Sequence, residues 1–139
     1  MELYHYVLIV ILMAVLDGVW ISLNMSVYND ATKAVQGTGI QVDYWGMVMS
    51  YACVFLLLAF YVLPTAKSAL HKDATPYDKF FVALKCGGLL GLLVYGVYNF
   101  TCKAILKKYP WDVAVRDTMW GGALFTLVCF GVLLLQTHH

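Results

Sequence analysis

Charged residues are scarce in this sequence. Only 12% of its 139 residues are Asp, Glu, Lys or Arg, against about 25% in an ordinary soluble domain. The formal net charge is +1, which excludes the strongly basic field of a nucleic-acid-binding protein. Hydrophobic residues make up 62% of the chain, more apolar surface than a soluble fold of this size could bury. The composition excludes a disordered chain and predicts a protein whose main solvent is lipid.

Ligands for metals and groups for covalent catalysis are also scarce. The four cysteines form no pair with metal-ligand spacing, and His5 and His71 stand alone along the chain. We therefore expect no metal site, no cofactor and no disulfide scaffold. The sequence contains no His-rich di-metal pattern, no Cys/His pair and no phosphate-binding glycine loop. These absences predict no catalytic residues and argue against an enzyme.

Four long apolar runs make up most of the chain, and each can supply the roughly 20 helical residues that cross a hydrocarbon core. The second run contains no charged residue. A soluble four-helix bundle is excluded because this helix would have no polar face for water. We predict an all-α fold, a four-helix transmembrane bundle with both termini on the same side, as one integral membrane domain over residues 1–139. The predicted spans are about 4–24, 44–63, 80–101 and 113–135.

The connections are short, apart from the first. It runs from Met25 to Asp43 and has the spacing for a short surface-lying helix. Pro64 is expected to close the second span, and Pro110 lies just before the fourth, where a helix tolerates proline. The first and third connections carry slightly more lysine and arginine than the middle connection, so we expect them to be cytoplasmic. A near-balanced count is also typical of dual-topology proteins.

Small residues recur at every fourth position in all four spans. In lipid there is no hydrophobic drive between helices, so close backbone approach through small residues must supply their association. We expect the bundle to be tightly packed through Gly18, Gly87, Gly91 and Gly122. The alternative is that one of these stripes faces a second copy of the chain or another membrane subunit.

Two spans share the pattern Asp-x-x-Trp, formed by Asp17 with Trp20 and by Asp117 with Trp120. The spacing of three residues puts the carboxyl group and the indole on one helical face. A carboxylate inside a span costs at least about 2.5–3.5 kcal/mol, so it normally faces protein or water. These two acids are therefore the first candidates for a functional site.

Counting residues along the spans places further polar residues at the same depth as the two acids. With a rise of about 1.5 Å per residue, Asp17, Asn99 and Asp117 fall at overlapping depths in the leaflet next to the first and third connections. We predict one polar cavity that serves as a ligand or ion pathway. Its predicted residues are Asp17, Trp20, Tyr95, Asn99, Asp117 and Trp120. The alternative is structural: Asp117 is satisfied by water, Arg116 or the nearby helix N-terminus, and Asp17 is neutral or paired with Lys103.

A family resemblance appears at these same residues. From Ala83 the chain reads Ala-Leu-x-x-Gly-x-Leu-x-Gly, and from Tyr95 it reads Tyr-Gly-x-Tyr-Asn-x-Thr, before Asp-x-x-Trp-Gly at Asp117. With Leu-Asp-x-x-Trp around Asp17 and Tyr28 downstream of it, the sequence resembles domain-of-unknown-function family 2177 over nearly its whole length. The resemblance implies an α-helical, multi-pass integral membrane protein and brings no established activity.

The chain departs from the pattern of that family at two positions. An aspartate commonly stands there where this chain has Asn99, and an asparagine where it has Cys102. These departures remove a charge and an amide, which puts in doubt any chemistry that relies on them. Members of that family are often encoded near lipid-modifying enzymes, so the resemblance implies a connection with lipid only by association.

Three classes of function follow from the sequence. The first is a small transporter or channel that moves an ion, a proton or a solute by means of the intramembrane acids. The second is a structural or assembly subunit of a larger membrane complex, and the third is an enzyme or accessory in lipid modification. We favour the first, because packing alone does not require two acids at one depth. The expected partners are the lipid bilayer and other copies or subunits in the membrane, with no nucleic acid.

Overall fold

The structure is a computed structural model and describes residues 1–136. Every element in this part of the chain is helical. Two π-helical turns, η1 and η2, join neighbouring α-helices without a break, so the chain forms four long helices that are apolar enough to cross a membrane. This confirms the predicted all-α fold with four spans. The elements are α1 (Leu3–Gln36), α2 (Tyr44–Leu57), η1 (Leu58–Val62), α3 (Leu63–Ser68), α4 (Pro76–Ala83), η2 (Leu84–Gly88), α5 (Leu89–Ile105) and α6 (Trp111–Leu135).

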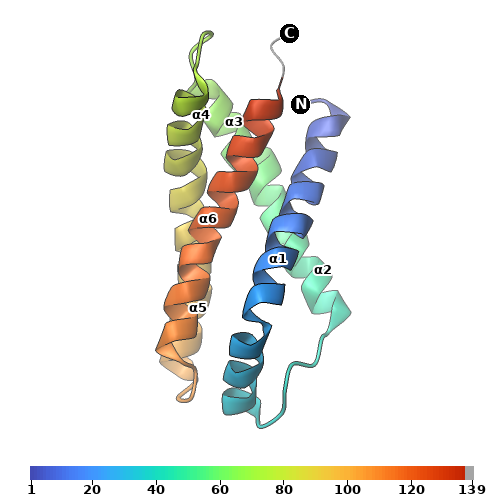
Figure 1. Cartoon of the computed structure of the whole chain (residues 1–139), viewed down its shortest axis with the longest axis vertical. Helices are drawn as coiled ribbons and strands as arrows, with labels where there is room; N and C mark the ends of the chain where they lie inside the picture. Colours follow the sequence, from blue (N-terminus) through green and yellow to red (C-terminus); the bar gives the residue numbers. More distant parts are fainter. Residues whose placement is uncertain (137–139) are drawn as a thin grey trace.

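The helix α6 is the centre of an elongated bundle. It contacts α1, α4, α5 and both π turns. In its most apolar stretch 56% of the residues are buried, against 11% in the corresponding stretch of α1. The start of α1 and the end of α6 lie at the same end of the bundle (Figure 1). The other helices are therefore held together mainly through α6.

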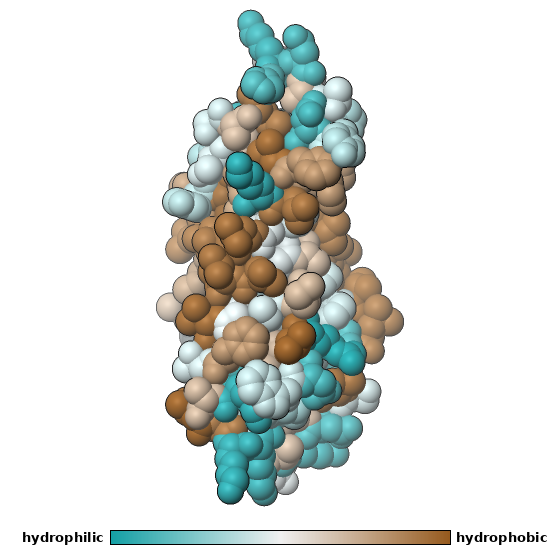
Figure 2. Space-filling model, turned by 90° about the vertical axis from the view of Figure 1, so that its left-hand side faces the viewer, coloured by the Kyte–Doolittle hydropathy of each residue, from teal (hydrophilic) through white to brown (hydrophobic). Residues whose placement is uncertain are grey.

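The apolar core occupies the half of the bundle that holds the start of α1 and the end of α6. Ile9, Leu58, Phe125 and Leu133 are among its largest fully buried side chains. Figure 2 shows apolar side chains across the middle of one face of the molecule and hydrophilic ones at its two ends. Such a band is typical of a surface that faces lipid between two aqueous boundaries.

The first helix is longer than the sequence predicts. It runs from Leu3 to Gln36, whereas the predicted span ends at about residue 24. No proline or glycine interrupts it between Gly18 and Gly37. The left-handed conformation of Gly37 (φ 82°) then ends the helix, and the Gly37 N–H donates to the Lys33 carbonyl at 2.9 Å. At about 1.5 Å per residue α1 is about 51 Å long, so its last turns can wall a site at one end of the bundle.

The second long helix continues through Pro64 to Ser68, so the prediction that Pro64 closes it is wrong. A proline inside a helix has no N–H to donate and leaves a carbonyl one turn earlier without a partner. The π turn η1 lies immediately before it and changes the hydrogen-bond register. The Thr65 hydroxyl also donates to the Tyr61 carbonyl at 2.7 Å. Pro110 lies directly before α6, as expected.

The start of α2 leans away from the bundle (Figure 1). The carboxylate of Asp43 caps this helix and accepts from the N–H groups of Trp45 (3.0 Å) and Gly46 (3.3 Å). All residues from 44 to 50 are exposed, and α2 has no buried residue. Because α2 does not close against the bundle here, the interior opens between α1, α5 and α6.

The helix α6 packs closely against α5 and the π turn η2, because glycines on each side face the backbone of the other side. A Cβ atom at Gly91 would lie 2.7 Å from Cγ of Phe125 and nearer still to the Gly121 carbonyl oxygen. A Cβ atom at Gly87 would lie 2.9 Å from the carbonyl oxygen of Phe125. Gly122 is placed less tightly, since its Cβ would lie 3.3 Å from the Gly88 carbonyl oxygen. These glycines lie where the sequence predicts a helix contact.

The prediction is wrong for Gly18, which does not lie at a helix contact. It is exposed, and a Cβ atom at this position would meet nothing within 4 Å. The inward face of α1 is formed by Ile9, Met13 and Asp17, at helical spacing. Gly18 follows Asp17 by one residue, a rotation of about 100°, which turns it outward. Within a single chain, the small residues of α1 therefore do not pack the bundle.

Candidate functional site

Asp17 points into the protein from the middle of α1. Its relative exposure is 9%. One carboxylate oxygen accepts a hydrogen bond from the Trp120 indole N–H at 2.9 Å, and the other accepts from the Tyr51 hydroxyl. These donors lie on α6 and α2, so the carboxylate of Asp17 ties three helices together.

Asp117 lies near the start of α6 and faces α1 and α5. Its Oδ1 accepts from the Tyr28 hydroxyl at 2.7 Å, and its Oδ2 accepts from the Asn99 amide at 2.7 Å. Tyr28 lies on the part of α1 that extends beyond the predicted span. The length of α1 is therefore what gives Asp117 one of its two partners.

Asn99 is fully buried on α5 and all its polar atoms have partners. Its Nδ2 donates to the Tyr95 carbonyl (2.9 Å) as well as to Asp117, and its Oδ1 accepts from the Tyr109 hydroxyl at 2.7 Å. Burial raises the pKa of Tyr109, so its hydroxyl keeps the proton that it donates. The Tyr109 carbonyl accepts from Lys103 Nζ at 2.7 Å. A chain of hydrogen bonds thus runs from Asp117 to the surface loop between α5 and α6.

The indoles of Trp20 and Trp120 connect the two carboxylates. The rings are stacked, with centroids 4.6 Å apart and an interplanar angle of 1°. Trp120 donates to Asp17, and Trp20 donates to the Tyr28 hydroxyl at 2.8 Å, which in turn donates to Asp117. The repeated Asp-x-x-Trp pattern thus forms one network in which the tryptophan of α6 binds the aspartate of α1.

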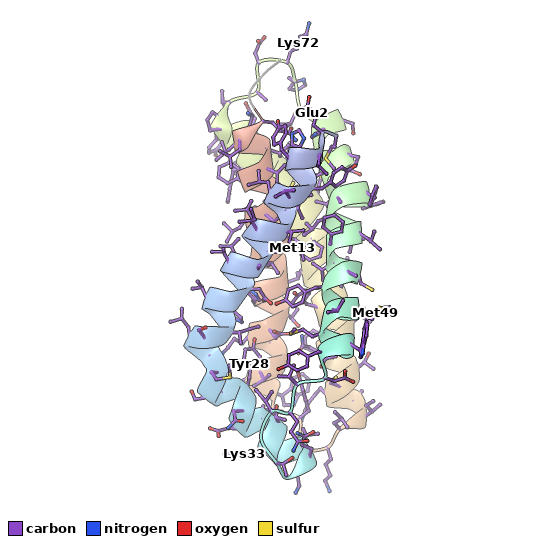
Figure 3. The ribbon with its side chains drawn as sticks, turned by 90° about the vertical axis from the view of Figure 1, so that its right-hand side faces the viewer. Glu2, Met13, Tyr28, Lys33, Met49 and Lys72 are labelled. Carbon is purple, nitrogen blue, oxygen red and sulfur yellow. The ribbon has the colours of Figure 1, made fainter. Side chains whose placement is uncertain are left out.

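A cavity of about 590 Å³ lies beside this network. Its walls come from the second half of α1, the loop between α1 and α2, the start of α2, α5 and the start of α6. Figure 3 views the molecule from the side of α1 and α2, and places Tyr28 in the half of the molecule that carries Lys33, away from Lys72. The polar and aromatic side chains that line the cavity include Asp17, Trp20, Tyr28, Tyr95, Tyr98, Tyr109 and Asp117.

Positive charge is directed away from the two carboxylates. The hydrogen bonds of Asp17 and Asp117 come from hydroxyl, indole and amide groups, all of them neutral. Lys103 donates to a carbonyl and lies 5.5 Å from the centre of the Trp111 ring. Arg116 donates to Asn24 Oδ1 at 2.8 Å. The alternatives that paired Asp17 with Lys103 or Asp117 with Arg116 are therefore not the arrangement in the structure.

The predicted site residues fall into two sets. Asp17, Trp20, Tyr95 and Asp117 line the cavity, whereas Asn99 and Trp120 support its carboxylates from behind. Tyr95 has room against α6 because Gly121 has no side chain, and a Cβ atom there would lie 2.6 Å from Cδ1 of Tyr95. The role of these residues in a ligand or ion pathway stays a prediction.

Three partners of the buried polar groups, Tyr51, Tyr28 and Tyr109, are not among the predicted site residues. A signal for Tyr51 was present in the spacing. It stands seven residues after Tyr44, where the second span begins, and Asp17 stands seven residues before the predicted end of the first span. Counting residues from the ends of the two antiparallel spans therefore places Tyr51 and Asp17 at equal depth in the membrane. No such count could find Tyr28, because the predicted first span ended before it.

Nearly the whole chain matches a known protein family. Residues 2–133 match the family DUF2177, described as a predicted membrane protein. No curated protein and no solved structure matches the chain. The matched range includes all of the network described above and most of each of the four apolar helices. The chain therefore belongs to the DUF2177 family and is a multi-pass integral membrane protein.

Proposed function

We propose that this protein binds a cation or a proton in the cavity between α1, α5 and α6 and carries it across the membrane, as a small transporter or channel. One observation carries the proposal. Two carboxylates from different membrane helices, Asp17 and Asp117, line the same cavity, and their hydrogen-bond donors are neutral. The negative charge of the two carboxylates is therefore left to be balanced by a cation or a proton that enters the cavity.

The energetic argument rests on the cost of an ion in the membrane. A carboxylate in the hydrocarbon region costs several kcal/mol unless it is paired, hydrated or protonated. Hydrogen bonds from hydroxyl, indole and amide groups stabilise the anion in part but bring no positive charge. Residues of this kind commonly mark ion and proton pathways in membrane proteins. A site built only for packing would gain more from apolar side chains of the same size.

The proposal is tested by charge-dependent flux in liposomes that contain the purified protein. With an imposed membrane potential, the wild-type protein should raise proton or cation flux above that of empty liposomes. Asp17→Asn keeps the shape and removes the charge, so it should lower this flux at least about tenfold. Asp30→Asn is the matched control, because Asp30 lies on the same helix and is exposed. Equal flux in wild-type, Asp17→Asn and empty liposomes would contradict transport.

A second candidate function is that of a subunit in a membrane assembly. It is favoured by the outward stripe of small residues on α1, where Ala14, Gly18 and Ser22 are all exposed. Such a stripe permits close approach of another helix in lipid. Cross-linking through Gly18→Cys in a background without the native cysteines should then trap a complex in cell membranes. A chain that stays monomeric in this experiment would contradict the second candidate.

A further inference from the structure

The lining of the cavity carries negative charge without any positive side chain. It contains Asp17 and Asp117, and none of the described residues that line it is Lys, Arg or His. A ligand that neutralises the site must therefore bring its own positive charge, or the site must take up protons.

The four carboxylate oxygens argue against a bare metal ion as that ligand. Each of them already accepts one hydrogen bond from a neutral donor: Trp120 and Tyr51 on Asp17, and Tyr28 and Asn99 on Asp117. A dehydrated metal cation needs several oxygen atoms in direct contact. A cation that carries its charge diffusely, on an alkylated nitrogen, needs no direct ligand. It is attracted by the charge of the carboxylates at longer range.

Aromatic rings supply the second kind of attraction that such a cation uses. Trp20, Tyr28, Tyr95, Tyr98 and Tyr109 all line the cavity together with the two acids. The face of an aromatic ring attracts ammonium groups, and cages of such rings recognise quaternary ammonium ligands. A set of five rings around two carboxylates is more than a proton pathway requires.

The size and the outer lining of the cavity indicate a ligand with an apolar part. The volume of about 590 Å³ lies within the range of sites for small organic ligands, and a water molecule takes only about 30 Å³. Towards the loop between α1 and α2 the lining is mostly apolar, with Val35, Ile40, Val42 and Met47 beside the polar Thr32 and Gln36. The start of α2, which borders this side of the cavity, is exposed.

We propose that the cavity binds an organic ammonium ion with an apolar tail, its head group between the rings and the two aspartates and its tail along the apolar lining. This inference rests on the proposed function and names the class of its ligand. The head group contributes specificity through its charge, and the tail contributes affinity through burial of apolar surface.

Calorimetric titration of the purified full-length protein in a neutral maltoside detergent tests the inference. The probes are hexyltrimethylammonium, tetramethylammonium without the tail, and neopentyl alcohol, which resembles the trimethyl head group in shape but has no charge. We expect hexyltrimethylammonium to bind at least about tenfold more tightly than either of the others. Binding of neopentyl alcohol as tight as that of tetramethylammonium would overturn the role of charge. Binding of tetramethylammonium as tight as that of hexyltrimethylammonium would overturn the role of the tail.

Variants separate the site from binding elsewhere on the protein. Asp17→Asn and Asp117→Asn should each weaken binding of hexyltrimethylammonium at least about tenfold, and Asp30→Asn should leave it unchanged. Tyr98→Leu removes a ring that lines the cavity and is 62% exposed, without touching the carboxylates. It should weaken binding about 3- to 10-fold, and it keeps the inference testable if an aspartate variant does not fold. Unchanged binding in Tyr98→Leu and in the folded aspartate variants would overturn the inference.

The two proposals fail in different ways. Proton flux that depends on Asp17, without any binding of hexyltrimethylammonium, would overturn the ammonium site and leave the transport proposal standing. Binding that depends on the aspartates, without flux of any cation, would support the ammonium site and overturn transport.

Discussion

At the scale of single residues, the amide of Asn99 makes a set of hydrogen bonds that an ionised carboxylate could not make. It donates to Asp117 and to the Tyr95 carbonyl, and it accepts from Tyr109. An ionised carboxylate at this position could accept from Tyr109 but could not donate to Asp117. Asn99 therefore leaves Asp117 as the acid at this end of the cavity and gives it a neutral donor.

Among the hydrogen-bonding partners of Asn99, the hydroxyl of Tyr109 can be removed by a single substitution. Tyr109→Phe would leave the fully buried Oδ1 of Asn99 without its donor. We expect the free energy of unfolding to fall by about 0.5–2 kcal/mol, since an unsatisfied buried group is costly but interhelical hydrogen bonds in membranes are modest. The measurement is thermal unfolding in detergent.

The control for this experiment is Tyr44→Phe, which removes a hydroxyl from a side chain that is 73% exposed at the start of α2. It should leave the melting temperature unchanged. A Tyr109→Phe protein as stable as the wild type would show that water replaces the lost donor.

At the scale of elements, the same residue type has opposite roles on two helices. Gly91 of α5 faces the backbone of α6, whereas Gly18 of α1 faces outward with nothing within 4 Å of a Cβ atom. In α1 the inward positions are taken by larger side chains, among them Ile9 and Met13. On α5 the contact with α6 is therefore made by glycine, whereas α1 presents larger side chains to the rest of the bundle.

A pair of identical substitutions tests this difference. Gly91→Ala places a methyl group against the Phe125 ring and the Gly121 carbonyl, so we expect it to lower the free energy of unfolding by about 1–3 kcal/mol. Gly18→Ala should keep or raise the stability of the monomer, because its methyl group meets nothing and alanine is the better helix former. Both variants are compared with the wild type by thermal unfolding in detergent. Equal stability of Gly91→Ala and Gly18→Ala would mean that α5 and α6 pack less closely in solution than in this structure.

At the scale of the whole molecule, the two halves of the bundle differ in what holds them together. One half has an apolar core around Leu58 and Phe125, and the other has a polar network and a cavity. The cavity lies at the end where the first and third connections join the helices. These connections carry the excess of lysine and arginine, so the positive-inside rule predicts that the cavity lies in the cytoplasmic half of the membrane.

Cysteine labelling of sealed cells tests this orientation. Single cysteines are placed at Lys33 and at Lys72, which lie at opposite ends of the molecule (Figure 3), in a background without the native cysteines. A membrane-impermeant reagent should label Lys72→Cys and should reach Lys33→Cys only after the cells are opened. Labelling of both positions in sealed cells would instead indicate dual topology.

The sequence by itself determined the four apolar helices, their order and the family to which the chain belongs. The hydrophobic runs are long enough that lipid burial outweighs every local preference. Asp17 and Asp117 were also identifiable from sequence, because a carboxylate inside such a run is too costly to be placed at random.

Only the tertiary structure decided which groups meet these acids and where the cavity lies. The end of α1 depends on Gly37, thirteen residues beyond residue 24, where the predicted span ends, and this extension brings Tyr28 to Asp117. The direction in which α2 leans and the contact of Tyr51 with Asp17 depend on packing against helices distant in sequence. Hydropathy fixes the depth of a residue in the membrane, but its rotation about the helix axis is set by neighbouring helices.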